Sequence, residues 1–474
     1  MVLLKRITEG KDAKQLIGLV VGLLIMGVSY FLPASPDLSH EATMSLGVLL
    51  GTVVMWLCGT MATGAAGMLG VLALVVLGVM PSLPEAMSGF IAPTTWFVLG
   101  VFCMTALMQK STLGIRLTKR FIMWAGADSR KLVLAIMGVT TLCSAIMTDT
   151  GAVALSMSFA LPLLGLIGAK AGSSNLGRCL MIGISFGACF GGFTTPIGHS
   201  LNVLALGLME QQAGITVGFL EWMTYGVPIA LIILPLAWLF ITKAFPPEAI
   251  SEDDIKTLMD NQFNVGKMTA HDVKSLVLLI AIPVLWILGN WIPFLNATTV
   301  ALFGMLMLFV PGMNILTWKE FESMTSWNLI LFFGTVLSLG GAVTATGAAD
   351  WIAALFLNSG ILDLPLFVSL LMIGIVLYLV NSVVPIALTW TTIFTLPLVY
   401  FAQAVGIAPV APVFLMVCLT AGSFIIPLCP SMNMTLDTGY YTFGEALKSG
   451  WETSIAIVLV AAIWVFFIAG VLGL

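Results

Sequence analysis

Charged residues are scarce in this chain of 474 residues: Asp, Glu, Lys and Arg make up 8% of it, whereas 59% is hydrophobic. Soluble domains carry about 25% charged residues. A water-soluble protein of this length could not cover its surface with so few charges, which excludes an ordinary soluble enzyme or binding module. The composition therefore predicts an integral membrane protein.

Several enzyme motifs are missing as well. The sequence contains no Gly-x-Ser-x-Gly or His-Glu-x-x-His run and no nucleotide-binding motif. Ser200 follows His199, but neighbours in one helix do not face each other, so no hydrolytic dyad is expected. The seven cysteines lack metal-binding spacing and are interpreted as small core residues. We expect no enzyme, no resident metal and no nucleic-acid partner; an intramembrane enzyme or a channel is the remote alternative.

Long uncharged runs fill most of the chain, and about 20 apolar helical residues cross a bilayer. The first run lacks a cleavage site of small residues, so we interpret it as a membrane helix and not as a signal peptide. The sequence predicts an all-α polytopic membrane protein with two re-entrant hairpins, at about 131–168 and 361–402. Eleven membrane spans are expected, at 16–34, 44–60, 63–80, 93–109, 177–211, 217–242, 275–293, 297–314, 327–346, 408–440 and 452–473.

The basic residues predict the orientation of these spans. With the N-terminus in the cytoplasm, all 18 Lys and Arg fall in inside segments, and the predicted outside segments contain none. Such asymmetry is typical of membrane proteins, whose cytoplasmic loops collect positive charge. We therefore expect a multi-pass protein of the cell (inner) membrane with a cytoplasmic N-terminus. The polar stretch 244–274 is interpreted as a solvated cytoplasmic linker.

The two halves of the chain resemble each other. Three pairs of identical residues share one separation of 231 positions: Trp96 with Trp327, Pro196 with Pro427, and Asn202 with Asn433. Trp96 lies at the outer end of its predicted span and Trp327 at the inner end, which predicts inverted repeats of the kind found in ion-coupled transporters. The predicted organisation is an N-terminal segment with scaffold helices (1–62), a first repeat (63–243), the linker (244–274) and a second repeat (275–474).

Each half also contains one interrupted span and one polar hairpin tip. The interruptions at 191–202 and 423–433 carry Pro, which removes a helical donor. Backbone groups freed within a membrane must face protein, water or ligand. N–H groups at a helix start can hold a carboxylate, and carbonyls and hydroxyls can hold a hard cation such as Na⁺. The tip residues are Ser144, Thr148, Asp149 and Thr150 in the first half, and Asn381, Ser382 and Pro385 in the second.

No Lys or Arg lies in a predicted membrane core. An anionic substrate would therefore need helix dipoles and co-bound cations to neutralise it, which is a physical reason to expect ion coupling. Asp149 is the acid expected near the midplane, where an ionisable residue is costly to bury. Its role as a cation ligand, a proton carrier or a structural group stays open. His199 is interpreted either as a ligand or proton-handling residue or as a hydrogen-bonded packing residue.

These motifs resemble the divalent anion:sodium symporter family over nearly the whole chain. The similarity lies in the hairpin and broken-helix pairs and in the run Gly-Gly-x-x-Thr-Pro-x-Gly-x-x-x-Asn at 191–202. The family carries Ser-Asn-Thr at its hairpin tips, whereas the first tip here reads Thr148-Asp149-Thr150. The resemblance implies a Na⁺-coupled transporter of small organic anions, such as dicarboxylates, citrate or sulfate. It also implies a homodimer that moves its hairpin domain as an elevator.

The resemblance further implies two cation sites and a substrate site between them. The residues that would line the first cation site are Ser144, Thr148, Asp149 and Gly198, and those of the second are Asn381, Ser382 and Cys429. The residues that would face the substrate are Asp149, Thr150, His199, Asn381, Ser382, Pro430 and Ser431. Coupling to H⁺ through Asp149, or transport of another anion such as sulfate, is the alternative on the same fold.

Overall fold

The computed structural model describes residues 11–292, 294–384, 387–426 and 429–471. Among them the regular elements are helices, and the one strand-like pairing is an isolated bridge between Ser35 and Leu38. Nine helices of this described part are long and apolar enough to cross a membrane, or ten if one bent pair is counted as a span. The predicted all-α polytopic fold is confirmed.

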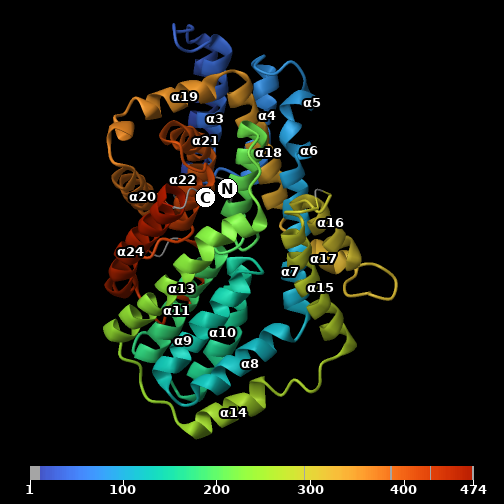
Figure 1. The fold of residues 1–474 in the computed structure, drawn as a ribbon, viewed down its shortest axis with the longest axis vertical. Coiled ribbons are helices and arrows are strands. Elements are labelled where there is room, and N and C mark those ends of the chain that lie inside the picture. The colour runs from blue at the N-terminus through green and yellow to red at the C-terminus, as the bar shows by residue number, and fades with distance from the viewer. Residues whose placement is uncertain (1–10, 293, 385–386, 427–428, 472–474) are drawn as a thin grey trace, which may run out of the picture.

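The first half of the chain forms the helices shown from blue to green in Figure 1. In order they are α2 (Lys11–Phe31), α3 (His40–Cys58), α4 (Thr63–Val76), α5 (Leu83–Ala86), α6 (Ser88–Ile91), α7 (Pro93–Lys110), α8 (Leu113–Ala125), α9 (Ser129–Ser144), α10 (Asp149–Leu166), α11 (Asn175–Gly192), α12 (Ser200–Ala213) and α13 (Phe219–Ala244). The axes of α7 and α8 meet at 60°.

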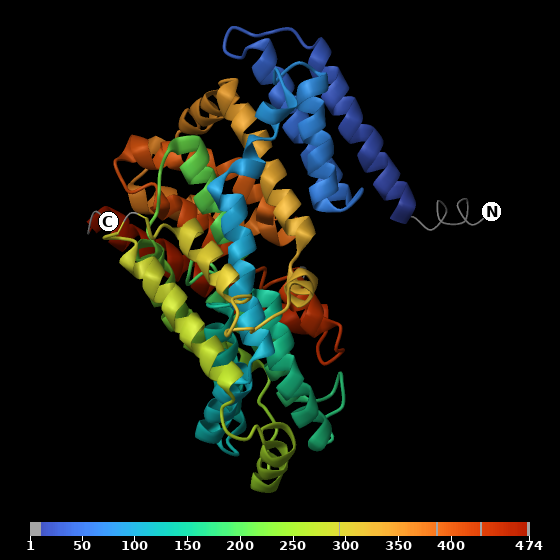
Figure 2. The same cartoon turned by 90° about the vertical axis from the view of Figure 1, so that its right-hand side faces the viewer.

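The linker and the second half continue from α14 to the end of the described chain. Their elements are α14 (Glu252–Gln262), α15 (Ala270–Leu288), α16 (Ala297–Met307), α17 (Trp318–Met324), α18 (Trp327–Ala345), α19 (Ala348–Leu357), the 3₁₀ turn η1 (Ile361–Asp363), α20 (Leu366–Val383), α21 (Ala387–Val405), α22 (Val410–Thr420), α23 (Pro430–Leu436), α24 (Phe443–Phe466) and a π-helical end (Phe467–Val471). Figure 2 shows α2 and α3 at one corner of the molecule and α14 at the opposite end.

Two helices begin well before the expected spans at 275–293 and 452–473. Helix α15 begins at Ala270 and α24 at Phe443. Each start is a capping box, Thr269 with Asp272 and Thr442 with Glu445, in which side chains satisfy the free N–H groups of the first turn. The polar residues that precede each apolar run therefore belong to the first turn of the helix. In contrast, α16 stops at Met307, before the expected end at 314.

The linker at 244–274 differs from the solvated segment that was expected. It contains α14, and its residues Ile250, Ile255, Leu258 and Phe263 are buried in a hydrophobic core. The Phe263 ring stacks on Phe159 of α10, with centroids 5.0 Å apart. An amphipathic helix of this kind buries one face although its overall composition is polar. The linker therefore packs against the first half.

Two hydrophobic cores organise the described helices. One is formed mainly by α9, α10, α11, α13, α22 and α24, and the other mainly by α3, α4, α7, α16 and α18. Helix α12 contributes to both, with Leu201 and Ala205 in the first core and Leu204 and Leu208 in the second. The two cores therefore meet along α12, which follows directly from the first interrupted span.

Candidate functional site

The first hairpin is formed by α9 and α10, which are separated by residues 145–148. Two hydrogen bonds hold this tip against the first interrupted span. The Ser144 hydroxyl donates to the Ala188 carbonyl at 2.7 Å, and the Thr195 hydroxyl donates to the Ala145 carbonyl at 2.6 Å. A Cβ added to Gly198 would lie 2.8 Å from the Ser144 carbonyl oxygen, so only glycine permits this approach.

The first break lies at residues 193–199, between α11 and α12. Side chains donate to several of the carbonyls freed here, as the interior of a membrane requires. The Asn202 amide donates to the carbonyls of Gly192 and Thr195, at 2.8 and 2.6 Å, and the Trp222 indole donates to that of Phe193 at 3.0 Å. These side chains therefore hold the unwound backbone at a defined position.

The carbonyl oxygen of the Asn202 side chain is buried and accepts no hydrogen bond within the described residues. Asn202 itself has no exposed surface. A buried acceptor without a donor costs about 1–3 kcal/mol. An oxygen in that position is also the kind of ligand that a hard cation takes. Asn202 ends the motif at 191–202, but the resemblance did not assign it to a site.

The second break lies at residues 421–429, between α22 and α23, and Pro427 and Leu428 fall outside the described residues. Two further buried oxygens without a donor lie beside it: the side-chain carbonyl of Asn381 and the hydroxyl of Ser423. The Asn381 amide donates to the carbonyl of Thr420, the last residue of α22, at 3.1 Å. This hydrogen bond joins the second hairpin to the second break, just as the first hairpin is joined to the first break.

Asn381 and Ser382, which the sequence placed at the second hairpin tip, lie at the end of α20. Helix α20 continues through Val383, so both residues belong to its last turn, and the Ser382 hydroxyl donates to the Tyr378 carbonyl. Val384 is the C-cap of α20, and α21 begins at Ala387. Pro385, which the sequence placed in this tip, lies outside the described residues.

Asp149, His199 and Ser431 meet although they come from three different elements. Asp149 begins α10, His199 is the N-cap of α12, and Ser431 lies in the first turn of α23. The Ser431 hydroxyl donates to Asp149 Oδ2 at 2.7 Å, and His199 Nε2 lies 3.6 Å from the same oxygen. The Asp149 and His199 side chains are only 14% and 13% exposed. The first hairpin, the first break and the second break thus converge on one carboxylate.

The other expected site residues lie around this point. Thr148 is the N-cap of α10 and Thr150 lies in its first turn, where N–H groups have no helical acceptor. Pro430 begins α23 and Cys429 caps it. The Cys429 thiol is hydrogen-bonded with the thiol of Cys189 on α11, so it faces the other half of the chain. Sequence reasoning gave no sign of this thiol pair.

A cavity of about 530 Å³ lies between α7, α15 and α16 on one side and α12 and α13 on the other. It is lined by residues such as Phe97, Trp286 and Phe219, and it reaches Pro196 of the first break. Asp149, His199 and Ser431 do not line it. The cavity lies between helices of the two hydrophobic cores, and it extends toward the site at the first break.

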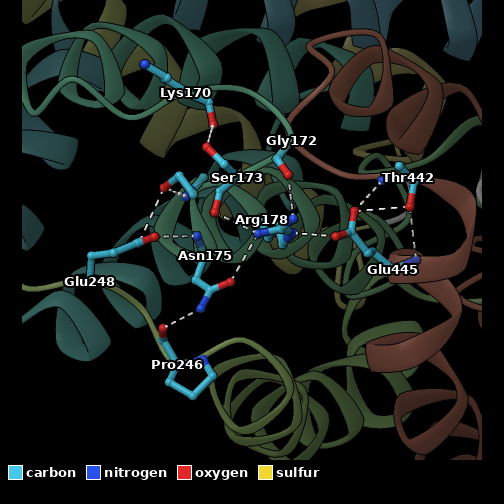
Figure 3. A network of polar contacts seen from close by, with 11 residues as sticks. Lys170, Gly172, Ser173, Asn175, Arg178, Pro246, Glu248, Thr442 and Glu445 are labelled. Atoms are coloured by element: carbon cyan, nitrogen blue, oxygen red, sulfur yellow. Dashed lines mark hydrogen bonds and ion pairs between the residues drawn. The ribbon is translucent and has the colours of Figure 1, made fainter.

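A network of polar contacts, the Glu248–Arg178 network, lies at the start of α11 (Figure 3). The Glu248 carboxylate accepts hydrogen bonds from the N–H groups of Asn175 and Leu176, and Arg178 Nε lies 2.6 Å from Glu445 of α24. Partial burial alone would raise the pKa of Glu248, but the hydrogen bonds from Leu176 and Asn175 outweigh it and hold that pKa below its ordinary value. The network joins α11, the linker and α24.

Comparisons with known proteins agree with this geometry. The family described as the sodium:sulfate symporter transmembrane region matches residues 13–472. A sodium-dependent dicarboxylate transporter of Staphylococcus saprophyticus is 24% identical, over 99% of this chain and 94% of its own. A namesake from Staphylococcus aureus is also 24% identical, over 72% of this chain and 70% of its own.

Two solved structures have a similar fold at 15% sequence identity. The Alcanivorax borkumensis YdaH transporter superposes with a TM-score of 0.55, over 96% of this chain and 98% of its own. Neisseria gonorrhoeae MtrF, described as one of a class of antimetabolite efflux pumps, superposes with a TM-score of 0.58, over 93% of this chain and 96% of its own. At this identity the likeness concerns the fold alone.

Proposed function

The chain belongs to the sodium:sulfate symporter family, and from that premise we propose that it is a secondary active transporter of small organic anions, coupled to Na⁺. Di- and tricarboxylates are the cargo class we favour, because the similar staphylococcal proteins are named sodium-dependent dicarboxylate transporters. Four buried side-chain oxygens of the described residues have no hydrogen-bond partner, one of them on Ser275 of α15. The observation that carries the proposal is the position of the other three, on Asn202, Asn381 and Ser423. They lie at two interrupted spans, where transporters bind their ions.

The proposed first cation site lies between the first hairpin and the first break. Its ligands come from Ser144, Thr148, Asp149 and Gly198, and we add the free oxygen of Asn202. The close approach of Gly198 to the Ser144 carbonyl supports this assignment, since it gathers backbone oxygens at one point. Several oxygens around one ion are what a hard cation prefers.

The proposed second cation site lies between α20 and the second break. Asn381, Ser382 and Cys429 are its expected ligands, and Ser423 joins them. Asn381 Oδ1 and Ser423 Oγ are both buried and both without a donor, which makes them the better supported of the four. The Ser382 hydroxyl already donates to a carbonyl, yet its own lone pairs can still face an ion.

The anion is proposed to lie between the two cation sites, against Asp149, Thr150, His199, Asn381, Ser382, Pro430 and Ser431. The start of α10 has no side-chain cap, and free N–H groups at a helix start attract carboxylates. The described ion pairs of Lys and Arg do not include Asp149. Bound Na⁺ would therefore supply the positive charge that the cargo needs.

We also propose that the two halves are inverted repeats that work as an elevator in a homodimer of the inner membrane, with the N-terminus in the cytoplasm. A matched packing detail supports the repeat. A Cβ on Gly226 of α13 would lie 2.7 Å from the Phe193 carbonyl oxygen of the first break, and a Cβ on Gly450 of α24 would clash with that of Phe424 in the second. The meeting of the two cores along α12 supports movement of one core past the other.

Coupling to H⁺ is the second candidate, and a specific observation favours it. Asp149 and His199 form a largely buried pair 3.6 Å apart at the centre of the site. Both side chains can exchange protons, and such pairs occur on proton paths in transporters. In this second candidate the fold and the proposed anion site stay the same, and H⁺ replaces Na⁺ as the coupling ion.

The test is uptake into proteoliposomes of labelled succinate, citrate and sulfate, driven by an imposed Na⁺ gradient or by a pH gradient. We expect uptake of a carboxylate under the Na⁺ gradient and altered cation dependence in Asp149→Asn. Asp260→Asn is the matched control, since Asp260 is exposed on α14. Uptake that follows only the pH gradient would favour the second candidate. Uptake of no anion under either gradient would contradict the proposed function.

A further inference from the structure

We propose that the cavity that reaches Pro196 is a second binding site, which takes an amphiphilic organic cation of the aromatic ammonium class and thereby inhibits transport. The cavity is distinct from the region proposed for the anion, because Asp149, His199 and Ser431 do not line it. Binding of the cation is independent of the proposed function, and only its effect on transport rests on that function. Three features carry the proposal: the aromatic wall of the cavity, the charge of its lining, and its position between the two hydrophobic cores.

Three aromatic rings from three helices form one wall of the cavity. The rings of Phe219 of α13 and Trp286 of α15 stack with their centroids 5.2 Å apart, and the ring of Phe97 of α7 meets Trp286 edge-on at 6.0 Å. The Trp286 indole donates to the Ala297 carbonyl at 2.9 Å, which fixes the orientation of its ring. The volume of about 530 Å³ lies within the roughly 300–1,000 Å³ of small-molecule pockets. The wall is therefore a preformed surface for an apolar or aromatic body.

The lining of the cavity is acidic. Its charged residues are Glu210 in the last turn of α12 and Glu221 in the first turn of α13, and among its described residues there is no Lys, Arg or His. Both glutamates are exposed, and neither takes part in a described ion pair. Glu210 also lines a smaller cavity of about 280 Å³, which shares Pro93 and Thr94 with the larger one. The two carboxylates therefore stand beside the aromatic wall without a basic partner.

This charge disfavours an anion and favours a cation. Two carboxylates repel the carboxylates of the proposed cargo, so the cavity is not the place where that cargo binds. An ammonium group is attracted both by the carboxylates and by the faces of aromatic rings, of which Trp is the best. The amides of the lining are already used within the protein: that of Asn290 donates to the Ile287 carbonyl, and that of Asn296 accepts from the Thr299 N–H. The glutamates are left as the groups that recognise a charged ligand.

The position of the cavity links its occupancy to transport. Helices α7 and α16 on one side belong to one hydrophobic core, whereas α13 on the other side belongs mainly to the second. A ligand that fills the cavity binds the arrangement in which the cavity exists and so stabilises that arrangement over others. Thr216, Leu295 and Asn296 of the lining belong to segments that the basic residues predict outside the cell, so the ligand would enter from there. Because the two sites are separate, more anion should not relieve the inhibition.

Calorimetric titration of the purified protein tests the binding. The probes are 3-hydroxyphenyltrimethylammonium, its uncharged isostere 3-tert-butylphenol, and choline, which has the charge without the ring. We expect the aromatic cation to bind about tenfold more tightly than either of the others. Glu210→Gln combined with Glu221→Gln should remove this preference over the isostere, whereas Glu41→Gln should behave as the wild type. Glu41 is the matched control, since it is exposed on α3 and does not line the cavity.

Uptake into proteoliposomes tests the consequence, with a labelled anion that the wild type carries. We expect the aromatic cation to reduce the maximal rate by more than half in the wild type, but not in the double Gln variant. If 3-tert-butylphenol binds as tightly as the cation, if the double variant keeps the wild-type affinity, or if the cation does not bind, the proposed cation site is ruled out. If the cation binds and the uptake rate is unchanged, its inhibitory role is ruled out. If the wild type carries no anion, the proposed function fails, and calorimetry still decides the cation site.

Discussion

Single oxygen atoms without a partner are the features of this protein that most need a ligand. Asn202 Oδ1, Asn381 Oδ1 and Ser423 Oγ are fully or almost fully buried and accept no hydrogen bond within the described residues. Such atoms cost about 1–3 kcal/mol each in an unliganded protein. A cation that draws several of them together removes this cost. Stability and ion binding are therefore linked at these residues.

Ser423→Ala tests that linkage without altering a known hydrogen bond. Because the Ser423 hydroxyl has no partner in the described chain, its removal should leave the sodium-free melting temperature unchanged or raise it slightly. The same variant should lose much of the stabilisation that Na⁺ gives. Ser185→Ala is the matched control: the Ser185 hydroxyl contacts that of Thr435, and its loss should destabilise by about 1 kcal/mol. If Ser423→Ala and Ser185→Ala lower the sodium-free melting temperature equally, Ser423 is an ordinary structural serine.

The sequence predicted Asp149 as a site residue because acids are rare in apolar runs, and the structure places it against His199 and Ser431. It did not predict Asn202 or Ser423 as free acceptors. An Asn or Ser beside a helix break is equally suited to capping freed carbonyls, and the Asn202 amide does so. Only the geometry reveals that its other end has no donor.

At the scale of elements, each break packs against a glycine of the second helix after it, Gly226 of α13 for the first break and Gly450 of α24 for the second. Gly450→Ala would force a Cβ into the Phe424 carbonyl oxygen, so the second break has to shift. We expect this variant to lose transport and to melt at a lower temperature. Gly444→Ala in the same helix has open space and should be neutral or stabilise by up to about 1 kcal/mol, as helical Gly→Ala changes do. Uptake and melting of the two variants, measured side by side, distinguish local crowding from a general effect of the substitution.

The Glu248–Arg178 network makes a pH-dependent contribution to stability. Since the folded pKa of Glu248 is held below its ordinary value, the ionised carboxylate stabilises the start of α11 above the unfolded pKa of about 4.3. This contribution is lost as the pH falls through the folded pKa. Glu248→Gln should therefore melt below the wild type at pH 7, and the gap should close as the pH falls below about 4. The exposed Glu252→Gln is the control, and a gap that is independent of pH would contradict this account.

Long elements were predicted more completely than short ones. The hairpins and breaks were located from interruptions in apolar runs, and the helices α9–α12 and α20–α23 surround them. Helices α8, α14 and α17 were not predicted, because each is short and carries charge on one face, so no long apolar run marks it. Helix α14 is recognisable only from its packing in the folded protein. Phe263, which follows it, packs against Phe159.

At the scale of the molecule, two hydrophobic cores share α12 and enclose the cavity that reaches Pro196. An elevator requires two bodies that slide past each other, and this boundary is where we expect the sliding. The site itself is assembled from both halves of the sequence, since Ser431 of the second contacts Asp149 of the first. Periodicity and charge predict each half alone, whereas a contact between the halves follows only from the fold.

The proposed topology has an odd number of spans, so the two termini should lie on opposite sides of the membrane. A green fluorescent protein fused after residue 474 should fail to fluoresce in bacterial cells, and an alkaline phosphatase in its place should be active. The same reporters inserted in the linker, between Glu248 and Ser251, should behave in the opposite way. Fluorescence at both positions would mean that the number of spans is even.

Binding of Na⁺ in the absence of any cargo tests the central claim most directly. The melting temperature of the purified protein would be measured as NaCl replaces choline chloride at constant ionic strength, for the wild type and for a variant with Asn202→Leu and Asn381→Leu. The account predicts a saturable rise with Na⁺ in the wild type and none in the variant. A wild-type melting temperature that is the same in both salts would contradict it.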